Sequence, residues 1–112
     1  MAIAHASPGE VIDVAPLGEA ITDTKTRTLL KSDDLEVLRL VLPAGKHIAE
    51  HKAPGEITVH CLEGRVRFTA MDKTQELTAG SLLYLEAAQP HALHAVEDSS
   101  LLVTILLRKK EH

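Results

Sequence analysis

The sequence predicts an all-β protein, and three observations lead to that fold class. Short runs of apolar and β-branched residues recur at intervals near ten residues, with turn-forming residues between them. No window of ten or more residues places its apolar side chains at helical spacing. A chain of 112 residues is long enough for one hydrophobic core but not for two. We therefore predict a single β-sandwich or barrel domain that spans residues 1–112.

The predicted strands follow one another along almost the whole chain. Residues 1–9 show no periodicity, so we expect a loose lead-in there, and Val11, Ile12 and Val14 indicate a first short strand. Residues 108–112 are predicted to form a solvated C-terminal tail. Alternation, β-branched content and flanking turn residues predict the remaining strands over 24–30, 35–42, 57–62, 65–70, 74–77, 81–85, 91–96 and 101–107.

Glu63-Gly64 has the length of a two-residue hairpin loop between two of these strands. Since directly opposed residues of a hairpin share a face, the loop predicts which side chains are buried. The predicted core face carries Ile57, Val59, Cys61, Val66, Phe68 and Ala70. The opposite, polar face carries Thr58, His60, Arg67 and Thr69. Cys61, the only cysteine, is therefore expected to be a small buried hydrophobe rather than a nucleophile.

Composition argues against two classes of partner. A formal net charge of −4 and only two aromatic residues, Phe68 and Tyr84, do not suit phosphate binding or base stacking, so we expect no nucleic-acid partner. The apolar runs are too short to cross a bilayer, and the N-terminus does not resemble a signal peptide, so we expect no membrane association. One cysteine fits a reducing compartment, and a cytoplasmic location is expected.

Histidines are concentrated in one stretch, Leu42 to Gly64, which holds three of the seven in the chain. Imidazole is a frequent ligand of transition metals, so a metal site is a natural hypothesis. In a regular strand His47 and His51 share a face but lie about 13 Å apart, which is too far for one ion unless the segment curls. His94 follows His91 by three residues and is expected on the opposite face of its strand.

The spacing of Gly45, His51, Gly64, Gly80 and His91 resembles that of the two sequence motifs of the cupin superfamily, the RmlC-like jelly rolls. The resemblance covers roughly residues 35–107 and implies a double-stranded β-helix, or jelly-roll barrel. The family's first motif continues with a second histidine and a glutamate, where this chain has Ala53 and Ile57. Its second motif contains a proline, a glycine and an asparagine, where this chain has Glu86, Ala88 and Ala95.

The metal site of the cupin family that this chain resembles uses three histidines and one glutamate, and holds Fe, Mn, Ni, Cu or Zn. The resemblance carries two of these four ligands over, His51 and His91, and implies that both face one pocket from neighbouring strands. His60 and His47 are further candidates for a third ligand. Because stable transition-metal sites mostly use three or four protein ligands, either other residues complete the site or the barrel binds metal poorly.

Three functions follow from this resemblance, since fold alone does not settle chemistry. One is a metal-dependent enzyme, similar to cupin dioxygenases or isomerases, in which the ion polarises a substrate oxygen or activates dioxygen. Another is a non-catalytic module that binds or senses a small molecule without metal. The third is a structural role without a ligand. The sequence specifies neither a substrate nor a reaction.

Two strands contain hydrophobic residues on both faces, Leu35 to Leu42 and Leu101 to Leu107. A strand in a half-solvated sheet should alternate, so a second covering layer is implied and a homodimer is expected. Arg39 interrupts the first of these strands on the face shared by Val37 and Val41. We expect its guanidinium at the pocket mouth, where it would suit a carboxylate or phosphate ligand.

Overall fold

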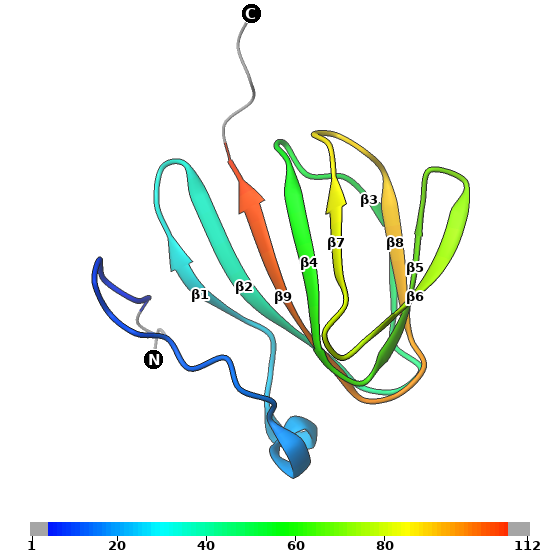
Figure 1. Ribbon diagram of the computed structural model, residues 1–112, viewed down its shortest axis with the longest axis horizontal. Coiled ribbons are helices and arrows are strands. Elements are labelled where there is room, and N and C mark those ends of the chain that lie inside the picture. Colours follow the sequence, from blue (N-terminus) through cyan, green and yellow to red (C-terminus); the bar gives the residue numbers. More distant parts are fainter. Residues whose placement is uncertain (1–4, 108–112) are drawn as a thin grey trace, which may run out of the picture.

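The computed structural model describes residues 5–107, which form two antiparallel sheets packed face to face (Figure 1). The strands are β1 Arg27–Lys31, β2 Leu35–Leu42, β3 His47–His51, β4 Ile57–Glu63, β5 Arg65–Ala70, β6 Lys73–Thr78, β7 Leu82–Leu85, β8 His91–Ala95 and β9 Ser99–Leu106. Their order is β1-β2-β9-β4-β7 in one sheet and β3-β8-β5-β6 in the other. This arrangement confirms the predicted all-β jelly-roll class. The predicted tail, 108–112, and the first four residues of the lead-in lie outside the described residues.

The segments before β1 and after β2 differ most from the prediction. Residues 11–14 form no strand, and the carbonyls of Val14 and Ala15 accept hydrogen bonds from Arg39 instead of joining a ladder. A 3₁₀ helix, η1 Gly18–Asp23, follows and was not predicted. The structure also contains β3, whose exposed polar residues gave no strand signal. Each of these segments lacks the alternation on which strand prediction depends.

The core lies between the two sheets, and its side chains come from alternate positions of the strands. The buried members are Leu42, Ile57, Val59, Cys61, Val66, Phe68, Leu77, Leu85, Leu93, Ala95, Leu101 and Val103. The predicted buried face of β4 and β5 is therefore correct, although Ala70 at its end is only partly buried.

The predicted hairpin pairing of β4 with β5 is wrong. β4 pairs with β7 and β9, whereas β5 pairs with β6 and β8 in the other sheet. Gly64 has φ +89°, and a Cβ at this position would overlap Ser99 and Asp98, so the chain needs glycine to turn here. Because this turn carries the chain around the end of the barrel, the inner faces of both strands still look into one core.

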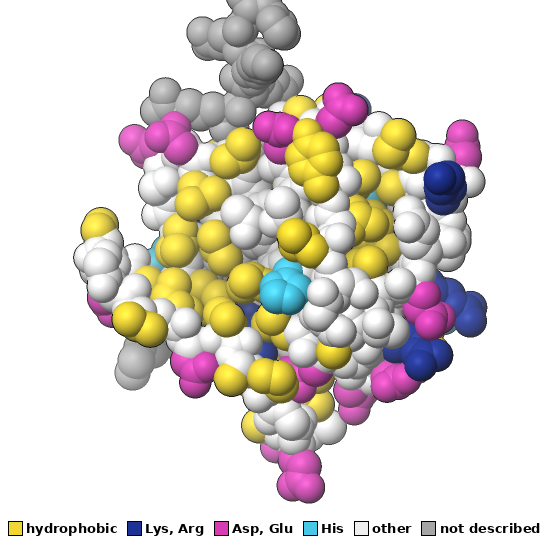
Figure 2. Space-filling view, in the orientation of Figure 1, with side chains coloured by type: hydrophobic (Ala, Val, Ile, Leu, Met, Phe, Trp, Pro, Cys, Tyr) yellow, Lys and Arg dark blue, Asp and Glu magenta, His cyan; other side chains and the backbone are white. Residues whose placement is uncertain are grey.

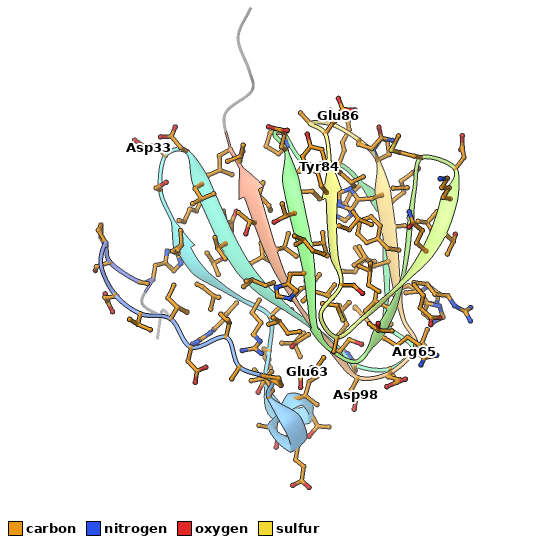
Figure 3. All side chains as sticks on the ribbon, in the orientation of Figure 1. Asp33, Glu63, Arg65, Tyr84, Glu86 and Asp98 are labelled. Carbon is orange, nitrogen blue, oxygen red and sulfur yellow. The ribbon has the colours of Figure 1, made fainter. Side chains whose placement is uncertain are left out.

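Arg39 lies on the outer face of the five-stranded sheet, not at the pocket mouth as predicted. Its side chain is buried beneath the N-terminal segment and lies 3.6 Å from the Glu63 carboxylate. The backbone N–H groups of Leu17 and Gly18 donate to the same carboxylate, at 2.8 and 3.0 Å. Figure 3 shows Glu63 beside η1, where the N-terminal segment meets the sheet. A buried arginine is tolerated here because a carboxylate and backbone carbonyls surround it.

Among the described residues, no helix is long and apolar enough to cross a membrane.

Candidate functional site: two histidines in the cavity between the sheets

An irregularity in β3 determines which histidines face the interior. Ile48 lies opposite Leu93 of β8 and His51 lies opposite His91, so three steps along β3 match two steps along β8. One extra residue of this kind is a β-bulge, which shifts the alternation of side chains by one position. Consequently His51 points inward while His47 points outward. The regular strand assumed above, with both histidines on one face, is thus not what forms.

The inward side chains of both sheets surround a cavity of about 420 Å³. Exposed Lys52 and Pro54 stand at its rim, so the cavity opens at the end of the barrel where β3 leaves its sheet. The walls are predominantly aliphatic. The lining residues are Glu36, Leu38, Leu40, Ile48, His51, Lys52, Ala53, Pro54, Ile57, Val59, Phe68, His91, Leu93, Val103, Ile105 and Leu107.

His51 and His91 meet edge to face within this cavity. Their ring centroids lie 4.2 Å apart with an interplanar angle of 61°. His91 also has an apolar neighbour, because the Phe68 ring stacks on it with a centroid distance of 5.5 Å and an interplanar angle of 8°. His91 is only 5% exposed, whereas His51 is exposed to solvent. The pair therefore joins the buried and open parts of the cavity.

Backbone carbonyls fix the tautomers of both rings. The Nδ1 atom of His51 lies 3.0 Å from the carbonyl oxygen of Ala49, and that of His91 lies 3.0 Å from the carbonyl oxygen of Gln89. A carbonyl oxygen can only accept, so each Nδ1 must carry the proton and donate it. In the neutral rings Nε2 is then left with a free lone pair, the arrangement found in histidines that bind metals.

Burial lowers the pKa of His91 below its ordinary value, although its hydrogen bond to Gln89 acts in the opposite direction. A positive charge on the neighbouring His51 would lower this pKa further. His91 is therefore neutral at neutral pH, as a metal ligand or hydrogen-bond acceptor must be.

The remaining ligands of the family motif are not replaced by nearby side chains. Ala53 lines the cavity and Ile57 is buried in its wall, and neither can bind a metal. Within residues 5–107, no three His, Cys, Asp or Glu side chains lie close enough together to hold an ion. Protein atoms thus supply two nitrogen donors at this site, His51 and His91.

The other two candidates lie on outer faces of the barrel. His60 lies opposite Leu82 and Leu102 on the outer side of the five-stranded sheet, as the alternation of β4 predicted. His47 lies opposite His94 on the outer side of the four-stranded sheet. Neither side chain lines the cavity that contains His51.

Two other residues refine the site. Glu36 lines the cavity and accepts a 3.0 Å hydrogen bond from the Thr28 hydroxyl, although it was not among the residues predicted for the site. Glu36 could have been predicted from the alternation of the strand, because it shares a face with Leu38 and Leu40, which also line the cavity. Cys61 is fully buried, and this burial raises the pKa of its thiol, which fits a packing role rather than a nucleophile.

Known proteins share this fold along the full chain. A family model described as the cupin domain matches residues 38–107. A conserved protein of unknown function from Streptococcus pyogenes has a TM-score of 0.76 and 28% identity, with 100% of both chains covered. A comparison with curated protein sequences finds no match.

Two further solved structures, at lower identity, are similar in fold. A cupin superfamily protein from Desulfitobacterium hafniense has a TM-score of 0.77 and 19% identity over 96% of this chain and 100% of its own. An RmlC-like cupin from Shewanella frigidimarina has a TM-score of 0.72 and 18% identity over 96% of this chain and 95% of its own. With most of its barrel matched by the family model, the chain belongs to the cupin family.

Proposed function

We propose that this cupin binds a small, largely apolar molecule in the cavity between its sheets, with the polar end of the ligand held by His51 and His91. A divalent transition metal ion is part of the proposal, with the two histidines as its protein ligands. The observation that carries the proposal is the pair of Nδ1–H donors fixed on backbone carbonyls, which leaves both Nε2 atoms available.

The cavity has the properties of a small-molecule site. Its volume of about 420 Å³ falls within the usual range for ligand pockets, about 300–1,000 Å³. Its walls are mostly aliphatic, and its polar lining residues are few: Glu36, His51, Lys52 and His91. Such a pocket favours an apolar body by removing it from water, while the histidines select a ligand with an oxygen or nitrogen atom at one end.

The number of protein donors bears on how the metal would bind. Two imidazoles supply fewer ligands than a stable transition-metal site uses, so water or the organic ligand must provide the rest. An organic molecule with two oxygen atoms at its polar end is the best complement. We expect metal and organic ligand to strengthen each other's binding for this reason.

The second candidate is a metal-free binding module that uses the same cavity. It is favoured by the absence of a third protein donor within residues 5–107. In this alternative the Nε2 atoms of His51 and His91 accept hydrogen bonds from the ligand directly. The two candidates differ in whether ligand binding depends on the ion.

Elemental analysis of the full chain, purified without a chelator or histidine tag, tests the metal. We expect near-stoichiometric metal that is lost in His51→Ala and His91→Ala. The matched controls His94→Ala and His60→Ala should retain it, because these histidines lie on outer faces. Metal below about one tenth per chain would exclude the metal-bound form.

A fluorescent naphthalene sulfonate probe tests the cavity separately. We expect its emission to rise with the wild-type chain and to fall when Ala53→Leu narrows the cavity. Binding that survives metal removal by a chelator would favour the metal-free candidate. Binding that is unchanged in Ala53→Leu would contradict the assignment of the cavity.

We further propose that the chain forms a homodimer through the outer face of the five-stranded sheet. Figure 2 shows hydrophobic side chains gathered over this sheet, with most charged groups towards the rim. Leu82, Tyr84 and Leu106 are 67%, 56% and 42% exposed, and Leu102 lies beside them, opposite His60. A second copy presents the same apolar face, so a two-fold contact buries both patches together.

Light scattering tests the dimer. We expect Leu82→Lys to dissociate it. Thr69→Lys, on the outer face of the other sheet, is the control and should leave the dimer intact. A wild-type monomer at micromolar concentration would contradict the contact.

We also propose a cytoplasmic location, because Cys61 is a free, buried thiol and a reducing compartment keeps thiols in that state.

A further inference from the structure

The outer face of the four-stranded sheet holds a second histidine pair within a continuous row of polar side chains. His47 of β3 lies opposite His94 of β8, which lies opposite Arg67 of β5. The two imidazoles are stacked, with ring centroids 4.0 Å apart and an interplanar angle of 8°. Arg67 in turn lies opposite Glu76 of β6. Four strands thus contribute one row that crosses the whole sheet.

The adjacent row creates a hollow beside this pair. Thr69 and Thr74 face each other on β5 and β6, and their hydroxyls lie 2.8 Å apart. Ala92 of β8 lies opposite Thr69, and its methyl group leaves space that a larger side chain would fill. The resulting cavity has a volume of about 310 Å³. Its lining residues are His47, Ile48, Ala49, Arg67, Thr69, Thr74, Ala92, Leu93 and His94.

Every side chain that lines this hollow and can carry charge is basic. The nearest carboxylate in the row, Glu76, lies 3.3 Å from the guanidinium of Arg65, a neighbour of Arg67 on the same face. Figure 3 shows Arg65 near the turn that connects the two sheets. Arg65 also lies 3.4 Å from Glu97. Glu76 and Glu97 thus both contact Arg65, and no ion pair within residues 5–107 involves Arg67.

We infer that this hollow is a binding site for a phosphate group, distinct from the cavity between the sheets. Arg67 supplies a permanent positive charge and a planar fork of N–H donors, which matches phosphate oxygens. The imidazoles of His47 and His94 and the hydroxyls of Thr69 and Thr74 supply further donors around the same space. A volume of about 310 Å³ accommodates a small phosphate monoester as well as the free ion.

The geometry favours an anion over a transition metal at this second pair. A metal ion here would lie beside the guanidinium of Arg67, without any carboxylate lining the hollow to offset the repulsion. Parallel rings also direct their in-plane lone pairs side by side rather than toward one point. The inner pair lies edge to face, in a cavity whose lining contains no arginine and includes the Glu36 carboxylate.

The experiment is a titration of the full-length chain with inorganic phosphate, and in parallel with phenyl phosphate, followed by calorimetry and by amide chemical shifts. We expect saturable binding, with shifts concentrated at Arg67, Thr69 and His94. Arg67→Gln should weaken binding at least tenfold, since a charge-assisted hydrogen bond to phosphate contributes about 1.5–3 kcal/mol. His94→Gln should weaken it by a smaller factor.

Two controls make the result specific. Arg27→Gln on β1 removes the same charge from the other sheet and should change the affinity less than about twofold, because exposed charges beyond a Debye length of about 8 Å are screened. His51→Ala alters the inner cavity and should leave phosphate binding intact, so this site and the proposed function are tested independently. Equal losses in Arg67→Gln and Arg27→Gln would overturn the inference, as would the absence of saturable binding. Binding of Zn²⁺ to His47 and His94 without any phosphate response would also overturn it.

Discussion

The two histidine pairs link the same two strands, β3 and β8, yet they occupy opposite faces of one sheet. His51 and His91 meet inside the barrel, and His47 and His94 stack on its outer surface. A single extra residue in β3, between Ile48 and His51, produces this difference. In a regular strand both β3 histidines would share a face, so the bulge is what brings one histidine into the cavity and leaves the other outside.

The surroundings of the two pairs then determine what each can bind. The inner pair is hydrogen-bonded to backbone carbonyls and surrounded by mostly aliphatic walls, and burial lowers the pKa of His91. The outer pair lies beside Arg67 and two threonine hydroxyls in a hollow lined by donors. Identical side chains are thus proposed to bind an apolar ligand or a metal on one side of the sheet, and an anion on the other. Environment, more than residue type, decides the chemistry of a histidine.

The largest expected difference between the two faces is in stability. Phe68 is 1% exposed and stacks on His91, so Phe68→Ala should lower the free energy of unfolding by about 3–5 kcal/mol. Thr69→Ala, one residue along on the outer face, should change it by less than about 0.5 kcal/mol. Urea denaturation followed by far-ultraviolet circular dichroism measures both. A similar loss of unfolding free energy in the two variants would contradict the assignment of Phe68 to the core and Thr69 to the surface.

A smaller difference is expected when the histidines themselves are truncated. His91→Ala leaves the carbonyl of Gln89 without its donor and removes the stacking on Phe68, which should cost about 1–3 kcal/mol. His94→Ala removes a partly exposed ring that stacks on His47, and should cost less than about 1 kcal/mol. Thermal denaturation of the two variants in a metal-free buffer provides the comparison. A larger loss in His94→Ala would reverse the proposed roles of the two pairs.

The third difference is between two ion pairs, the buried pair of Arg39 with Glu63 and the exposed pair of Arg65 with Glu76. Partial burial alone would raise the pKa of Glu63, but hydrogen bonds from Leu17, Ser100 and Gly18, together with the charge of Arg39, hold it below its ordinary value of 4.5. A carboxyl group whose pKa is lower in the folded state than in the unfolded state stabilises the fold at pH values above its ordinary pKa. This stability is lost as the pH falls through the folded-state pKa.

Glu63→Gln should therefore be less stable than the wild type at neutral pH and should show a flatter decline in stability below about pH 4.5. Urea denaturation midpoints of both proteins, measured from about pH 3 to about pH 7, would show this difference in acid stability, because carboxyl groups titrate within that range. Glu76→Gln is the matched control, since its exposed ion pair with Arg65 contributes little. A wild-type acid profile in Glu63→Gln would exclude the carboxylate as a stabilising partner of Arg39.

The sequence predicted the elements of the barrel better than their partners. Strong alternation and bounding turn residues located β2 and β5 at the observed bounds, and the other strands between residues 57 and 106 within about two residues. The inner faces of β4 and β5 were also correct, because alternation is a local property of each strand. The pairing of β4 with β5 was not, because Gly64 permits either a hairpin or a turn from one sheet to the other.

For the candidate site, the intervals between glycines and histidines predicted that His51 and His91 face one pocket, and both side chains line the cavity between the sheets. Two features escaped the sequence. Glu36 enters the cavity wall from a strand treated only as apolar, and Arg39 is turned away from the cavity and buried against Glu63. Both outcomes depend on which layer covers each face of β2, which the strand's own residues do not specify.

The sequence by itself thus determined an all-β cupin barrel, its buried alternation and the two histidines at matching motif positions, because these depend on spacing along the chain. Only the tertiary structure decided the bulge in β3, the change of sheet at Gly64 and the resulting division of four histidines between two faces. Hydrogen-bond register between distant strands sets these features. A shift of one residue in that register moves a side chain from the core to the surface, and no local pattern encodes it.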